Sequence, residues 1–154
     1  MKKLAWKLII PLTVISFFLF TKWWYTLPVD APDTVFIGFP FPFVCNGWHT
    51  SMSLQVFIFE LIVDLLIYFI FWFLLIFIFN RFVKKIYINK LITGFLLSIA
   101  VVIVIFSTWI ASSKDNIFYL KRAFKMEVME TGYKFIGQKQ PLPDFKKYHP
   151  EKFK

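Results

Sequence analysis

The sequence predicts an all-α membrane protein with three transmembrane helices and a basic C-terminal tail that is amphipathic and partly extended. Apolar residues make up 58% of the 154 residues, above the roughly 45–50% of soluble domains. They gather in runs, and the stretch 91–111 carries no charge at all. About 20 apolar residues cross a hydrocarbon core of ~30 Å. A soluble fold of this size could not bury so much apolar surface.

The first predicted span covers about residues 4–21, and its flanks are typical of a membrane surface. Lys2, Lys3 and Lys7 lie at its start, and the aromatic cluster WWY follows its end, as in the aromatic belts at headgroup level. The start resembles a signal peptide, but the bulky sequence FTKWWYT stands where a cleavage site needs small residues. We therefore expect an uncleaved anchor.

A proline-rich loop is predicted for residues 22–53. Pro28, Pro32, Pro40 and Pro42 lie in it, and proline removes the backbone N–H that a regular helix needs. The loop also contains the apolar sequence VFIGFPFPFV. We expect it to lie on the membrane surface or against the spans.

Two further spans are predicted, for about residues 54–79 and 91–111. The loop between them, 80–90, is basic. The chain thus divides into a three-span membrane domain, 1–111, and a basic tail, 112–154.

The orientation follows from lysine and arginine residues near the span ends, which favour the cytoplasmic side. The N-terminal flank and the loop 80–90 carry seven of them, against five in the first loop and the near part of the tail. We expect the N-terminus in the cytoplasm of a bacterial cell, a multi-pass inner (plasma) membrane location, and the loop 22–53 and the C-terminus outside. The net charge of +9 does not indicate nucleic-acid binding, because it lies where anionic headgroups would meet it.

The tail has two pieces with structural signals. In NIFYLKRAFKM, Ile117, Leu120 and Phe124 recur at helical spacing among basic residues, which predicts a helix lying in the headgroup region. The piece EVMETGYKFIG predicts a short hairpin around Thr131 and Gly132. The last fourteen residues are expected to be extended or disordered.

Glu60 and Asp64 are the costly residues of the second span. Counted from Leu54, Asp64 lies about 15 Å deep at a rise of 1.5 Å per residue. An acidic group there costs at least about 2.5–3.5 kcal/mol, and a spacing of four places both acids on one helix face. These two residues therefore need compensation.

A polar seam across the three spans could supply part of that compensation. At matching depths the other spans carry hydroxyl residues, namely Thr13, Ser16 and Ser107. Three interpretations stay open: the acids are protonated or reach outer water and lock the helices together, they await a basic residue of another membrane subunit, or they relay protons or bind a cation.

The first loop holds three further candidates, Cys45, Trp48 and His49. Cys45 and His49 are too few for a metal site, which needs three or four ligands, so no metal and no cofactor is predicted. A catalytic Cys–His pair needs an activating environment and a substrate pocket, of which the sequence has no other sign. The plain expectation is a packed cysteine, with Trp48 and His49 at headgroup level.

The segment GFPFPF is followed by a span with DLLIYFIFWF. It resembles uncharacterised small bacterial multi-pass membrane proteins that place a Gly-aromatic-Pro segment before an Asp-bearing span. The similarity covers about Gly38 to Trp72, and it implies no activity.

The function expected from these features is that of a non-enzymatic accessory subunit or assembly partner of a larger membrane complex. Its partners are the lipid bilayer and other membrane subunits or further copies of itself. The alternative is a small oligomeric protein that conducts protons or cations through Glu60 and Asp64. A membrane enzyme that uses Cys45 and His49 ranks third.

Overall fold

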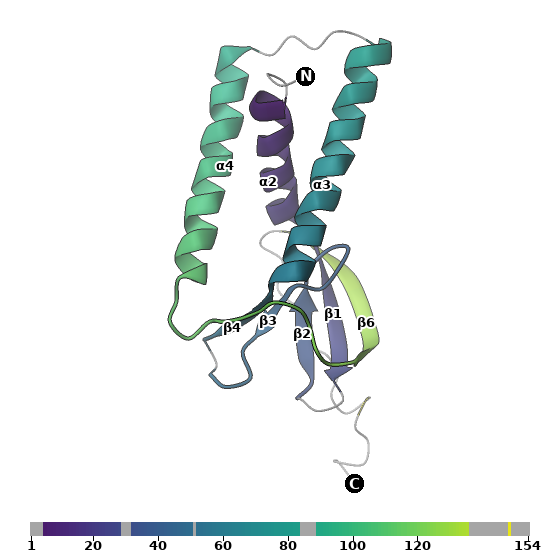
Figure 1. Cartoon of the computed structure of the whole chain (residues 1–154), viewed down its shortest axis with the longest axis vertical. Helices are drawn as coiled ribbons and strands as arrows, with labels where there is room; N and C mark the ends of the chain where they lie inside the picture. The colour runs from purple at the N-terminus through teal and green to yellow at the C-terminus, as the bar shows by residue number, and fades with distance from the viewer. Residues whose placement is uncertain (1–4, 29–31, 51, 84–88, 136–147, 149–154) are drawn as a thin grey trace.

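Three helices stand on a six-stranded mixed sheet (Figure 1). The structure is a computed structural model that describes residues 5–28, 32–50, 52–83, 89–135 and 148. The predicted all-α class is wrong, because segments expected to be loop and tail pair as strands. Predictions for residues 1–4 and 84–88, and for all of 136–154 but Tyr148, lie outside the described residues.

The helical layer consists of α2 (Ile10–Leu19), α3 (Ile58–Ile78) and α4 (Lys90–Ala111). A π-helical turn, η1 (Ala5–Ile9), leads into α2, and another, η2 (Phe79–Val83), continues α3. Helix α2 contacts both α3 and α4 and so links them. Of the described helices, two are long and apolar enough to cross a membrane, Ile58–Val83 and Lys90–Ala111.

The prediction of three spans is wrong: two of the described helices are long enough to cross a membrane. The first helical segment ends at Leu19, because the chain runs straight into a strand at Phe20, and it is shorter than a membrane span. The predicted second span, 54–79, begins with a strand, and its helix starts only at Ile58. Helix α4 covers the range predicted for the third span.

The strands follow the order β5-β4-β3-β2-β1-β6 across the sheet, and all neighbours are antiparallel except the parallel pair β4–β5. Their bounds are β1 (Phe20–Pro28), β2 (Thr34–Ile37), β3 (Val44–Asn46), β4 (Leu54–Phe57), β5 (Ile117–Tyr119) and β6 (Met126–Phe135). All six lie at one end of the helices, and η2 and the beginning of α2 lie at the other (Figure 1).

The face of the sheet that points away from the helices carries a small aromatic core. Phe36, Cys45 and Phe57 are at most 2% exposed and pack together, and Phe124 packs against them. Phe124 comes from residues 120–125, a strap that joins β5 at one edge to β6 at the other and crosses this face (Figure 1). Both faces of the sheet are therefore covered by other parts of the chain.

The two predictions for the tail are corrected by this arrangement. The piece expected to be an amphipathic helix forms β5, the strap and the start of β6, and its Leu120 is 79% exposed whereas Phe124 packs in the core. The expected hairpin is one continuous strand, because β6 pairs with β1 through Gly132. A Cβ atom at Gly132 would lie 2.7 Å from Trp23 Nε1, so this glycine serves a close approach and not a turn.

The strap can be tested through its anchor. Phe124→Ala removes ring contacts with Phe36, Phe57 and Trp48 and, because Phe124 is half-buried, should lower the free energy of unfolding by about 1–3 kcal/mol. Thermal unfolding followed by circular dichroism measures the loss. The neighbouring exposed change Leu120→Ala is the control and should cost less than about 0.5 kcal/mol. Equal losses in both variants would contradict the assignment of Phe124 as the anchor.

Candidate functional site

The site that the sequence singles out lies at the sheet end of α3. Because β4 takes up residues 54–57, Asp64 is six residues into the helix and about 9 Å along its axis. It is therefore closer to the helix start than the 15 Å counted from Leu54. Glu60 lies in the first turn of α3, where the helix dipole favours a negative charge.

Asp64 is fully buried and binds the loop between β2 and β3. Its Oδ1 accepts a hydrogen bond of 3.0 Å from the backbone N–H of Phe41. Phe41 lies between Pro40 and Pro42, so it carries the only backbone N–H group of that Pro-Phe-Pro triplet. The carboxylate thus satisfies the amide that the two prolines leave without a neighbour.

The rest of this loop is held by backbone hydrogen bonds at both ends. The N–H of Gly38 donates to Lys22 O over 2.9 Å, and the N–H of Phe57 donates to Phe43 O over 2.8 Å. Gly38 has a φ of +155°, and a Cβ atom there would lie 2.1 Å from Phe41 O, so only glycine fits. The peptide bond Phe39–Pro40 is cis. The GFPFPF segment is therefore held in a defined conformation against α3.

Glu60 is 8% exposed, and the strap reaches it. Its Oε1 accepts from the backbone N–H of Arg122 over 3.4 Å. Within the described residues, Glu60 Oε2, Asp64 Oδ2 and Arg122 Nη1 are buried without a hydrogen-bond partner. Part of the compensation that the acids need thus comes from this chain itself, from a loop and a strap far away in sequence.

The hydroxyl groups of the predicted polar seam do not meet the two acids. Thr13 donates to Ile9 O over 2.9 Å, and Ser16 donates to Leu12 O over 2.7 Å, both inside the α2 segment. Ser107 lies on α4 and lines a cavity above the sheet. In the part of the chain that the structure describes, none of these three bonds to Glu60 or Asp64.

Two residues of the site were missed by the sequence reasoning, Tyr68 and Trp72. Tyr68 donates through its hydroxyl to Phe20 O over 2.7 Å, at the C-cap of α2, and Trp72 Nε1 donates to Ser16 Oγ over 2.9 Å. With Glu60 and Asp64 they form the α3 polar stripe, four polar side chains at successive intervals of four residues. That spacing places them along one helix face and is a signal that the sequence carried.

The stripe joins α3 to four other segments. From the sheet end outward it binds the strap, the loop 38–43, the start of β1 and α2. It therefore acts as an anchor that positions the helices on the sheet.

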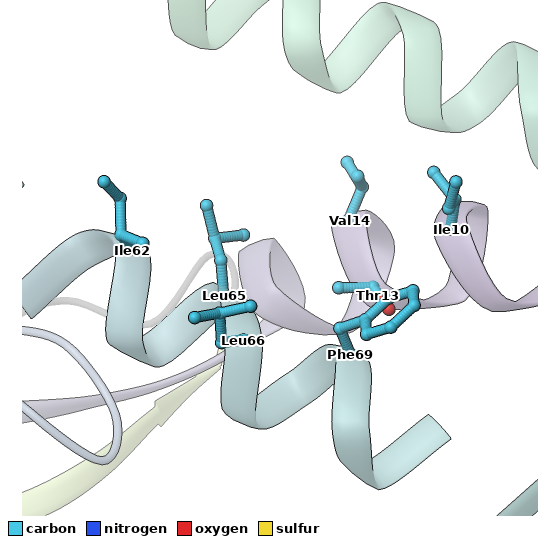
Figure 2. A pocket seen from close by; sticks show the side chains of 7 residues that line it. All are labelled: Ile10, Thr13, Val14, Ile62, Leu65, Leu66 and Phe69. Atoms are coloured by element: carbon cyan, nitrogen blue, oxygen red, sulfur yellow. The ribbon is translucent and has the colours of Figure 1, made fainter. Parts of the chain in front are cut away.

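An apolar groove lies beside this stripe, between α2 and α3. Figure 2 shows Val14 and Thr13 of α2 near Leu65 and Phe69 of α3. Its volume is about 270 Å³. The Thr13 hydroxyl is used within its own helix, so the groove offers surface for packing and no group for chemistry.

Cys45, Trp48 and His49 do not assemble into a reactive centre. Cys45 is 2% exposed, and its Sγ lies 3.9 Å from Gln55 Oε1. Trp48 Nε1 donates to Thr34 Oγ1 over 2.9 Å, and its ring packs on Phe124, whereas His49 is exposed. Burial raises the pKa of the Cys45 thiol to about 12, which disfavours the nucleophilic thiolate.

A metal centre is not present among the described side chains either, since no three of their His, Cys, Asp and Glu residues form a group that could hold an ion.

Comparison with protein-family models, curated proteins and solved structures finds no match for this chain. The resemblance based on the GFPFPF segment therefore stays a prediction.

The bond between Asp64 and the loop leads to a test with two variants. Asp64→Ala removes the acceptor of the Phe41 amide, which should cost about 1–3 kcal/mol of stability, as for a hydrogen bond to a charged group, and speed hydrogen exchange at residue 41 about tenfold or more. Asp64→Asn keeps an acceptor oxygen and should retain most of the protection. Exchange measured by mass spectrometry in detergent micelles follows both effects.

The control for this experiment is Ile70→Ala, an exposed position of the same helix. It should leave exchange at residue 41 unchanged. If Asp64→Ala also leaves it unchanged, the carboxylate does not hold the loop.

The burial of Cys45 leads to a pH-dependent prediction. Because its pKa is raised in the folded state, iodoacetamide at pH 8 should alkylate the native thiol about 100-fold more slowly than the denatured one. Raising the pH above the ordinary thiol pKa of about 8.5 ionises only the unfolded thiol, so native stability should fall there. Mass spectrometry of timed samples gives the rates.

The matched control moves the thiol by one position, to an exposed site. The double variant Cys45→Ala with Asn46→Cys should label at the rate of a free thiol, because Asn46 is exposed. Native Cys45 labelled as fast as this control would revive the interpretation as a membrane enzyme.

Proposed function

We propose that this chain is a multi-pass integral membrane protein that acts without catalysis, as an accessory subunit or assembly partner of a larger membrane complex. Helices α3 and α4 cross the bilayer, α2 is inserted beside them, and the sheet lies at the extracytoplasmic surface. The outward face of α4 is the surface for a partner helix.

Large apolar side chains that lie open along α3 and α4 support membrane insertion. On α3, Leu66, Ile70 and Phe71 are 51–57% exposed, and on α4 Val102 and Ile105 are 63–64% exposed. Monomeric soluble proteins rarely expose contiguous apolar patches of more than a few hundred Å². Lipid tails cover such a surface without the cost that water would impose.

The arrangement of charges supports the orientation. The strands lie at one end of the helices (Figure 1), so the first loop and residues 117–135 belong to one side of a bilayer. Lys7 in η1 and Arg81 in η2 belong to the opposite end. By sequence, the N-terminal flank and the loop 80–90 carry seven basic residues, against five in the first loop and the near part of the tail. Because basic residues near span ends favour the cytoplasm, we expect the sheet outside.

The observation that carries the proposed partner role is the outward face of α4, made of Gly94, Ser98, Val101 and Ile105. At 100° per residue these four positions lie within about 60° of one another, and a Cβ atom at Gly94 would meet nothing within 4 Å. The buried residue of α4, Ala100, lies on another side. Small residues spaced by four let membrane helices approach closely, so this face suits a helix of a second chain.

The alternative, ion conduction through Glu60 and Asp64, can be tested separately in liposomes. The hydrogen bond from the Phe41 amide gives Asp64 a structural role, and this role explains a buried acid without any ion conduction. Liposomes that hold the purified protein would show a proton leak, abolished in Asp64→Asn, if the alternative were right.

A substitution on the outward face of α4 tests the partner role. Gly94→Leu should weaken association by about tenfold or more, equivalent to about 1.4 kcal/mol, because the bulky side chain keeps a partner backbone away. Membranes are solubilised in a mild detergent, and the mass of the complex is measured by size exclusion with light scattering. Phe95→Leu, at a neighbouring exposed position, should leave the mass unchanged.

Two results would contradict the proposal. One is a wild-type chain that is a monomer in mild detergent and also fails to cross-link in membranes. The other is release of the chain from membranes by alkaline carbonate, which would show that the chain is not inserted in the membrane.

A further inference from the structure

A cavity of about 560 Å³ lies between the helices and the sheet. We name it the junction cavity. Its roof comes from the sheet-side ends of α2 and α4, with Phe17, Ser107 and Ile110 among its walls. Its volume falls in the range of roughly 300–1,000 Å³ that is typical of small-molecule sites.

The floor of the junction cavity is a continuous apolar row across four strands. Ile37 pairs with Val44, Val44 with Val56, and Val56 with Phe118, and all four line the cavity. Directly paired residues project from the same face of a sheet, so the row forms one apolar track. Phe118 at its end is 49% exposed.

The two faces of these strands differ, because the opposite face is packed with side chains of this same chain. There Phe124 and Met126 complete the core around Phe36. On the helix side, α4 ends at Ala111, and in the described part of the chain the track borders the open space of the junction cavity. An apolar cavity that water fills poorly is a site for an apolar ligand.

Basic residues follow the cavity wall at the end of α4. Lys114 lies in the turn between Ala111 and Asn116, which both line the cavity, and it is exposed. Lys121 and Lys125, also exposed, follow in the strap, and Asp115 is the acidic residue of this stretch. Residues 112–125 thus place a net positive charge beside the apolar junction cavity.

We propose that the junction cavity binds one acyl chain of an anionic phospholipid, with the phosphate of its headgroup at Lys114. The apolar track takes the chain, and the basic turn takes the negative charge. The cavity lies where the candidate spans meet the sheet, which is headgroup depth if the helices cross the bilayer. This inference rests on the membrane insertion proposed above and is independent of a partner helix.

The experiment uses the full chain in nanodiscs with two photoactivatable phospholipids, phosphatidylglycerol and phosphatidylcholine, each with a diazirine on the acyl chain. After illumination, mass spectrometry locates the cross-links. We expect cross-links from phosphatidylglycerol at peptides that contain Val44, Ile110 or Phe118, about fivefold above those from phosphatidylcholine, as one basic residue near a membrane surface allows.

Filling the cavity should abolish this signal. Ala111→Phe and, independently, Ser107→Phe place a ring inside it and should reduce cavity cross-links about tenfold. Val102→Phe adds the same ring at an exposed position of α4 and should change nothing. Lys114→Gln should remove the preference for phosphatidylglycerol while leaving cross-links to the chain. Circular dichroism checks that each variant folds.

Several results would overturn the inference. Cross-links confined to the outer surfaces of α3 and α4, equal signals in the filled and control variants, or equal yields from the two lipids each exclude the proposed ligand. Release of the wild-type chain from membranes by carbonate would instead refute the membrane insertion. The two failures are therefore distinguishable.

Discussion

The hydrogen bond from the Phe41 amide to the Asp64 carboxylate is the interaction on which the rest of the structure depends. The Asp64 carboxylate is fully buried, and a buried carboxylate without a donor costs free energy. The hydrogen bond of 3.0 Å from the Phe41 amide offsets part of that cost. It fixes the loop between β2 and β3 against α3, and so it fixes where the first strands stand relative to the helices. Gly38 allows this path, because no side chain fits beside Phe41 O.

The α3 polar stripe extends this principle along the helix. Each of its four side chains bonds to a different segment, so α3 is tied to the strap, the loop, the start of β1 and α2. Apolar contact between helices is weakly directional. Hydrogen bonds at defined points can set the geometry that such contacts leave open. The acids expected to await a partner or an ion thus contribute first to assembling this chain.

The sheet shows why the strands could not be predicted from pattern. With helices over one face and the strap over the other, strands such as VCN and LQVF have no regular exchange of apolar and polar residues, which is the main sequence signal of a half-buried strand. Pro40 and Pro42 correctly excluded a helix, but they lie in a turn between strands. In the tail, the helical spacing of Ile117, Leu120 and Phe124 was a coincidence, since Phe124 packs against the core and Leu120 is exposed.

The sequence by itself determined the two long apolar helices, because their length and composition are local properties that need no knowledge of neighbours. It also singled out Glu60 and Asp64, since acids in an apolar run are costly wherever the chain folds. Only the tertiary structure decided what meets them and where the strands pair. Asp64 binds an amide 23 residues away, and Glu60 binds one 62 residues away. Such partners are selected by the closing of long loops around a sheet, and no short window of sequence contains both ends of the contact.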